Sequence, residues 1–207
     1  MASTNSLLVV TVAWNSNAWK GSAAAGDGLG FRYVKDGGFP AESWNFDFGS
    51  PRNPKGYLLA YVPRIEGCRL DAADIVITSQ PDGEADRYVI GLFLDAEIEK
   101  ENTEEGGAML RGEGCYTNLR VAQHLAVSFA SAPVKWNIKR HYGKDYGNRN
   151  WPGQKTFMYM DHTHARKLFS EIVDKHQKLL AVAGIDKEER LRCEKAVLLA
   201  TKLMGVS

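Results

Sequence analysis

The first group of residues that could do chemistry is a short polar segment bounded by two tryptophans. Trp14 and Trp19 stand five positions apart and flank three small polar side chains, Asn15, Ser16 and Asn17. An indole ring offers a flat face for a nucleobase, and Asn and Ser side chains can hydrogen-bond to base edges. The same residue types also favour turns. The segment is therefore either a base-reading site or a turn that follows a core tryptophan.

The second group is a basic segment, residues 135–155, with six Lys or Arg, one acid and four aromatic residues. Basic side chains contact phosphates and aromatic rings stack on bases, so this composition is typical of a nucleic-acid surface. The alternative is a solvated loop with cation–π pairs. The residues predicted to contact the nucleic-acid backbone are Lys135, Lys139, Arg140, Lys144, Arg149, Trp151 and Lys155.

The charge of the whole chain requires such a surface to be local. Lys and Arg number 26 against 25 Asp and Glu, a formal charge of +1, so no overall basic field would attract nucleic acid. Residues 84–113 carry nine acids and three bases. We expect that acidic segment to face away from a phosphate backbone.

Three weaker candidates point to other chemistry. A glycine-rich run at 26–30 lacks the spacing of phosphate-binding loops, and a turn is the simpler interpretation. His162 and His164 are two positions apart, which does not place them on one helix face, so capping is favoured over a metal site. Cys115 could be a nucleophile with His124 or His141 as its base, although free cysteines are more often buried. We predict no catalytic residues, no metal and no cofactor.

Length and composition exclude several classes of protein. The 207 residues are 44% hydrophobic and 25% charged, which is typical of a folded domain rather than a disordered chain. The longest apolar runs are far shorter than a membrane helix, and the first residues lack the basic region of a secretory signal. The three cysteines form no metal-binding or disulfide pattern. A cytoplasmic protein with no membrane partner is expected.

The elements that would position these residues are mainly strands, followed by helices. β-Branched runs predict strands at 6–14, 56–62, 74–79 and 87–99, and the turn at 80–83 predicts an antiparallel hairpin with a bend at Gly91. Residues 117–129 fit either a strand or a short helix.

Two helices are predicted at the C-terminus. The first, 161–180, has helical spacing of its apolar residues, namely Ala165, Leu168, Phe169, Ile172 and Val173. Gly184 ends it, and Asp186 caps a second helix whose inward residues are expected to be Leu191, Val197, Leu198 and Leu203. Strands followed by helices indicate an α+β fold.

The hairpin segment resembles a known family. Residues 74–79, Asp-Ile-Val-Ile-Thr-Ser, then a Pro/Gly turn and the Val89-Ile90-Gly91 step, are similar to a pattern of the PUA-like superfamily, especially EVE and YTH-type domains. The resemblance covers residues 6–20 and 56–99, with a weaker likeness at 135–160. The insert at 15–56 is longer than in a minimal EVE domain, and the helices after Gly184 are an addition.

The resemblance implies a twisted β-barrel flanked by helices, in which a flipped modified base sits in an aromatic cage. Trp14, Asn15 and Ser16 match the end of the first strand, and Ser79 matches the small polar residue that ends the paired strand. Trp19 and Trp44 are assigned to the cage by residue type alone, and Asn17 is a further candidate for reading the base edge.

These expectations combine into one functional hypothesis. Residues 1–183 would form an EVE/PUA-like base-reading domain, and residues 184–207 a C-terminal helical extension. The domain would read a modified cytosine or adenine in double-stranded DNA by base flipping, without catalysis. It would serve a restriction system, with a nuclease or motor as a partner or fused domain. The alternatives are a PUA-like module that binds RNA, or a small hydrolase using His141, His162 or Cys115.

Overall fold

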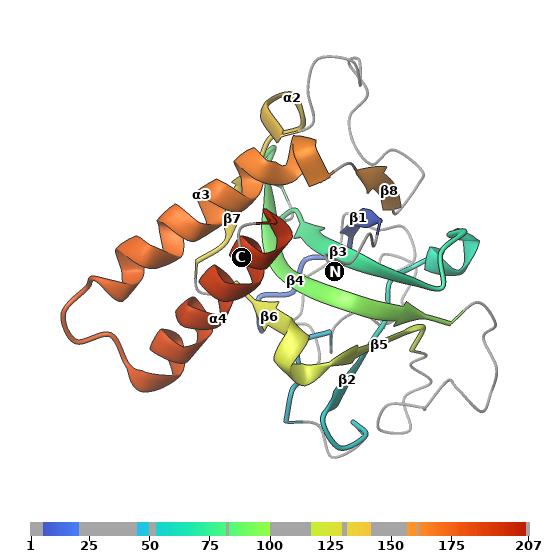
Figure 1. Ribbon diagram of the computed structural model, residues 1–207, viewed down its shortest axis with the longest axis horizontal. Coiled ribbons are helices and arrows are strands. Elements are labelled where there is room, and N and C mark those ends of the chain that lie inside the picture. Colours follow the sequence, from blue (N-terminus) through green and yellow to red (C-terminus); the bar gives the residue numbers. More distant parts are fainter. Residues whose placement is uncertain are drawn as a thin grey trace.

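The computed structural model describes residues 6–20, 45–49, 53–81, 83–99, 117–129, 132–141, 157–160 and 162–205. This part of the chain is an α+β fold, with one mixed sheet and two long helices packed against one of its faces (Figure 1). The predicted α+β class and the helical C-terminus are confirmed.

The sheet consists of eight strands, and it is open in the part of the chain described. The strands are β1 (Leu7–Thr11), β2 (Tyr57–Ala60), β3 (Ala72–Ser79), β4 (Arg87–Ile98), β5 (Leu119–Ala122), β6 (Ala126–Ser128), β7 (Val134–Trp136) and β8 (Phe157–Met160). Their order is β2-β5-β4-β3-β1-β8, with β6 and β7 also paired to β4. The predicted hairpin of β3 and β4 is antiparallel as expected, whereas β1 pairs with β3 in parallel.

The long strand β4 organises the sheet, and it curves along its length (Figure 1). On one side it pairs with β3, and on the other with β7, β6 and β5 in turn. A register shift opposite Ile77 and Thr78 lies beside Gly91. A Cβ at Gly91 would be 2.6 Å from the carbonyl oxygen of Val127 and would collide with the ring of Phe46. Glycine is therefore required here because Phe46 packs directly on the strand.

Residues 117–129, which the sequence left undecided, are mainly extended. They form β5 and β6, with a short 3-10 helix, η3 (Gln123–Leu125), between them. A second 3-10 helix, η2 (Ile65–Gly67), follows β2.

Both faces of the sheet are buried, because residues that alternate along each strand enter two separate hydrophobic clusters. In β1, Leu7 and Val9 face the helices, whereas Leu8 and Val10 face the opposite cluster with Phe46. Every residue of β1 is accordingly buried. Such a continuous apolar run is typical of a strand covered on both faces.

The helices are α2 (Ile138–His141), α3 (His162–Leu180) and α4 (Lys187–Leu203). The predicted inward face of α3 is confirmed, with Val173 only partly buried. The predicted cap is also confirmed, because the Asp186 carboxylate accepts a hydrogen bond from the backbone N–H of Glu189 at 2.9 Å. Gly184, in the turn between the helices, has a φ of 81°.

The predicted inward face of α4 is wrong in part. Leu191 and Leu198 are 56% and 65% exposed, and Val197 is only partly buried. Leu203 is buried as predicted, and the other buried residues of the helix are Cys193, Ala196, Leu199 and Ala200. Three of these are small, so α4 can approach its neighbours closely, and a pattern of leucines alone points to the wrong face. The inward residues Ala196, Leu199, Ala200 and Leu203 of α4 belong to the same hydrophobic cluster as α3 and the strands.

No helix in the described ranges is both long enough and apolar enough to span a bilayer.

Candidate nucleic-acid interface

One end of the sheet collects several segments that the sequence singled out. The parallel strands β1 and β3 finish there at Thr11 and Ser79, and the antiparallel pairing places Arg87, Trp136 and Phe157 at the same end. We call this end the carboxyl rim. In open sheets with parallel strands, ligands bind beyond the carboxyl ends of those strands.

The basic segment is attached to the carboxyl rim at both of its ends. It leaves the sheet after β7, where Trp136 pairs with Arg87, and it returns at β8, where Phe157 pairs with Val10. β7 and β8 lie on opposite sides of the β4-β3-β1 group, so the two attachment points flank those three strands. This arrangement brings the ends of the segment to the same part of the molecule as Ser79 and the segment that leaves β1.

The acidic segment runs along β4, and the chain leaves this strand at the other end of the sheet. The backbone N–H of Glu99, just after β4, donates to the carbonyl oxygen of Asn118, just before β5. β4 has 12 residues, which corresponds to about 36 Å if it were straight. Two acids of the same segment, Glu84 and Asp86, lie instead in the turn before Arg87 at the carboxyl rim.

The polar segment after β1 is a turn fixed by its own side chains. Asn15 is 2% exposed, and its side-chain oxygen accepts a hydrogen bond from the backbone N–H of Asn17 at 2.7 Å. The next two residues, Ala18 and Trp19, both have positive φ, at 57° and 56°. Such values are uncommon for residues with a Cβ and persist only where the surroundings enforce them. Asn15 therefore serves as a turn former, which corrects its prediction as a residue that reads a base.

Trp19 enforces the turn by entering the core. It is 1% exposed, its indole N–H donates to the carbonyl oxygen of Ala13 at 3.0 Å, and its ring meets Phe46 edge to face. A ring in this position has no open face for a base, so the prediction of Trp19 as a cage residue is wrong for this conformation. The physical reason is that burial of a large aromatic ring outweighs the cost of the positive φ.

Trp14 differs from Trp19, because it is only partly buried. Its ring packs against Trp19 at right angles, with 5.4 Å between centroids. Ser16 and Asn17 are exposed on the same turn. Trp44, the remaining predicted cage residue, lies outside the described residues.

Ser79 is brought next to the segment after β1, as predicted, but its side chain is used there. It is fully buried, and its hydroxyl donates to the carbonyl oxygen of Val12 at 3.0 Å. The hydroxyl ties the end of β3 to the end of β1. Ser79 is therefore a structural residue, which corrects its prediction as a group that contacts the base.

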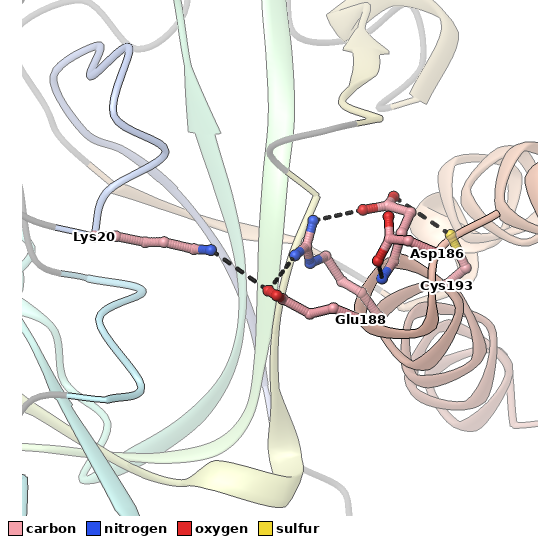
Figure 2. A network of polar contacts seen from close by, with 6 residues as sticks. Lys20, Asp186, Glu188 and Cys193 are labelled. Carbon is pink, nitrogen blue, oxygen red and sulfur yellow. Dashed lines mark hydrogen bonds and ion pairs between the residues drawn. The ribbon is translucent and has the colours of Figure 1, made fainter.

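Lys20, at the end of the turn, points toward α4. Its amine lies 3.7 Å from the carboxylate of Glu188 (Figure 2). Glu188 also pairs with Arg192 at 2.8 Å. Both partners of the Lys20 pair are well exposed, and such pairs are weak and screened by salt.

Two of the predicted phosphate-binding residues have described side chains, and both are in ion pairs. Lys135 lies 2.5 Å from Asp86, and Arg140 lies 2.7 Å from Glu171. The hydrogen bond to Asp86 raises the pKa of Lys135, whose side chain is exposed at the carboxyl rim. The described part of the chain includes neither the side chain of Lys139 nor the remaining four predicted residues, Lys144, Arg149, Trp151 and Lys155.

His141 anchors the start of the basic segment to α3. Its Nδ1 accepts from the backbone N–H of Asn137 at 3.1 Å, so its Nε2 carries the proton and donates to Glu171 at 3.0 Å. Desolvation by burial lowers the pKa of His141, which keeps the ring neutral at pH 7. Because both ring nitrogens are engaged, His141 is not available as a general base in this conformation. The other residues of the hydrolase alternative, Cys115 and the side chain of His162, lie outside the described residues.

A polar network that no sequence pattern indicated joins β1, β3 and β4 at the carboxyl rim. Arg87 donates from Nη1 to the hydroxyl of Thr11 at 2.6 Å and from Nη2 to the side-chain oxygen of Gln80 at 3.2 Å. Thr11 and Thr78 are joined at 3.1 Å, and Thr78 donates to the carbonyl oxygen of Val10 at 2.7 Å. A lone arginine at the start of a strand has no spacing pattern that could have identified it.

In comparisons with known proteins, neither a family model, nor a curated protein, nor a solved structure matches this chain.

Proposed function

We propose that this protein is a non-catalytic nucleic-acid-binding module whose binding surface is the carboxyl rim. The observation that carries this proposal is the attachment of both ends of the basic segment to the rim, where the Trp14–Asn17 turn also begins. A phosphate backbone lying across the rim would meet cations of residues 135–155. Glu99 and Asn118, the described residues on either side of the acidic run 100–116, lie at the far end of the sheet.

The finer proposal is that the module reads a modified cytosine or adenine in double-stranded DNA by flipping it toward Trp14. Extruding a base costs a few kcal/mol, stacking on an aromatic ring returns about 1–3 kcal/mol, and phosphate contacts add a term that depends on salt. Burial of one added methyl group contributes about 0.8 kcal/mol. Ser16 and Asn17 are the exposed polar residues next to Trp14 that would contact the base edge.

The assignment to a PUA/EVE-like barrel belongs to the same proposal, as do a cytoplasmic setting and a nuclease or motor partner. Its support is the residue pattern of β3 and β4, together with the way β4 is shared between β3 on one side and three short strands on the other.

The proposal is tested by fluorescence anisotropy with short labelled duplexes that differ only in one modified base. We expect binding that weakens steeply with salt and is tightest for one modified duplex. Trp14→Ala should reduce the preference for that duplex. The matched control is Tyr57→Ala, which removes an exposed aromatic ring from the outer strand β2, away from the rim.

Two results would count against parts of this proposal. Absence of binding to every duplex at low salt would refute nucleic-acid binding. Tight binding to RNA of the same sequence, with a requirement for the 2′-hydroxyl, would replace the DNA assignment with the RNA-binding alternative.

A further inference from the structure

We propose that Arg87, held between Thr11 and Gln80 at the carboxyl rim, is a binding site for a phosphoryl group. The assignment of that group to the backbone of a nucleic acid rests on the proposed function above. Arg87 was not among the residues expected to bind phosphate, and it belongs to β4 rather than to the basic segment.

The first argument is the unusual set of partners around the Arg87 charge. Both of its hydrogen-bond acceptors, the Thr11 hydroxyl and the Gln80 side-chain oxygen, are uncharged. Within the described ranges no carboxylate lies within ion-pair distance of its guanidinium. The two described acids of the preceding turn have other partners, since Asp86 pairs with Lys135 and Glu84 contacts the hydroxyl of Tyr88 at 3.5 Å.

A cation in this position is costly without a counter-ion. Arg87 is partly buried, and desolvation by burial lowers its pKa to about 10. The group still carries its charge at pH 7. Because burial of an unpaired charge is unfavourable, an anion that approaches Arg87 gains more than it would at a fully hydrated cation.

The second argument is that the neighbouring hydroxyls hold the guanidinium in a defined direction. A hydroxyl has one hydrogen, and Thr78 gives its hydrogen to the carbonyl oxygen of Val10. Thr11 must therefore donate to Thr78, which leaves a Thr11 lone pair to accept from Arg87. The chain of bonds runs in one direction, from the charge into the sheet. An arginine positioned in this way presents its remaining N–H groups without further ordering.

The third argument is an unpaired donor on the residue that pairs with Arg87 across the sheet. Trp136 is its partner across the β4–β7 pair and is 6% exposed. Its indole N–H finds no hydrogen-bond acceptor in the described structure. A phosphoryl group has several strong acceptor oxygens, and the planar fork of arginine can donate to two of them at once.

The site is tested by thermal unfolding of the full chain in rising concentrations of sodium phosphate, with sodium chloride and sodium acetate at matched ionic strength. At about ten times its dissociation constant, phosphate should raise the melting temperature of the wild type on the order of 3 °C above both reference salts. Arg87→Gln should abolish this difference. The matched control is Arg120→Gln, which removes an arginine paired with Glu97 near the far end of the same sheet, and it should retain the difference.

A second readout separates the phosphate site from the proposed function. In anisotropy titrations with a duplex, Arg87→Gln should weaken binding about tenfold and reduce the salt slope by about one phosphate contact. Arg87→Lys keeps the charge but lacks the planar fork that can donate to two phosphate oxygens at once, so it should weaken binding severalfold. It provides the test if the glutamine variant does not fold.

Each outcome decides one of the two proposals. Equal stabilisation of the wild type and Arg87→Gln by phosphate, or equal binding of the duplex by both, would overturn the Arg87 site and leave nucleic-acid binding standing. Loss of phosphate stabilisation in Arg87→Gln, without duplex binding by the wild type, would support the site and refute the proposed function. In that case a mononucleotide or inorganic phosphate is the source of the phosphoryl group. Stabilisation by acetate equal to that by phosphate would overturn the assignment to phosphate.

Discussion

The imidazole of His141 donates from Nε2 to the carboxylate of Glu171 over 3.0 Å, which ties the short helix α2 to the middle of α3. The ring is 1% exposed and packs against Trp136, with 5.3 Å between centroids. The contact fixes the point at which the chain leaves the carboxyl rim for the basic segment. The neutral state of this buried ring is therefore a condition for the local structure.

The first prediction concerns pH. Burial lowers the pKa of His141 and of His176, so the folded state binds fewer protons than the unfolded state just below pH 6.5. The contribution of these two neutral rings to the free energy of unfolding is therefore fully present above pH 6.5. It is lost as the pH falls from 6.5 toward the lower pKa of the folded state. Each histidine contributes a slope of at most about 1.4 kcal/mol per pH unit. Urea unfolding at pH 7, 6 and 5 measures this slope.

The matched variants for this prediction are His141→Gln and His124→Gln. The first should be less stable at pH 7 and show a shallower loss of stability between pH 7 and 5. The second removes an exposed histidine of η3 and should leave the slope unchanged. A wild type whose stability is the same at pH 5 and pH 7 would contradict the assignment.

The second prediction concerns Gly91. Gly91→Ala should destabilise the protein by about 1–3 kcal/mol, because the added methyl group collides with the Phe46 ring and with the backbone of Val127. Gly67→Ala is the control, since a Cβ there meets open space, and its effect should stay within about 0.5 kcal/mol. Denaturant unfolding compares the two. Equal stability of both variants would show that Phe46 does not pack on β4 in this way.

The third prediction separates the two tryptophans of the turn. Trp19→Phe removes the indole N–H that binds the Ala13 carbonyl, and it should cost about 1–2 kcal/mol of stability. Its affinity for a duplex should remain within about twofold of the wild type when most of the protein is folded. Anisotropy and denaturant unfolding measured on the same samples test both parts. A stable Trp19→Phe variant with greatly reduced binding would restore Trp19 as a stacking residue.

The contrast between these tryptophans shows what the sequence could and could not predict. The β-branched runs predicted the core strands, and Asp186 predicted the start of α4, because local propensity and capping agree there with the tertiary structure. Spacing alone could not distinguish Trp14 from Trp19, since burial depends on Phe46, which is distant in the sequence. The same limit applies to Ser79, whose partner is Val12.

Two other features depend on contacts between distant residues. The parallel pair of β1 and β3 lies between β8 and β4, an order that no local pattern specifies. Arg87 has its role only because Thr11, 76 positions away, lies beside it. Conversely, the leucines of α4 followed a helical pattern, yet small residues determined which face packs inward.

The fourth prediction concerns charge at the carboxyl rim. Asp86→Asn should tighten duplex binding severalfold, because it removes a negative charge from the rim and releases Lys135 from its ion pair. Lys135→Gln should weaken binding and lower the salt slope by about one. Lys178→Gln, which removes an exposed lysine of α3, is the control and should change neither. Tighter binding in Lys135→Gln, or weaker binding in Asp86→Asn, would contradict a phosphate backbone at the rim.

The most direct test of the central claim is to map where the nucleic acid lies. A duplex that carries a photoreactive base is cross-linked to the wild-type protein by ultraviolet light, and the attached peptides are identified by mass spectrometry. We predict cross-links to peptides that contain Trp14, Arg87 and residues 135–155, all of which are attached at the carboxyl rim. Cross-links confined to residues 99–118 or to α4 would place the nucleic acid elsewhere and contradict the account.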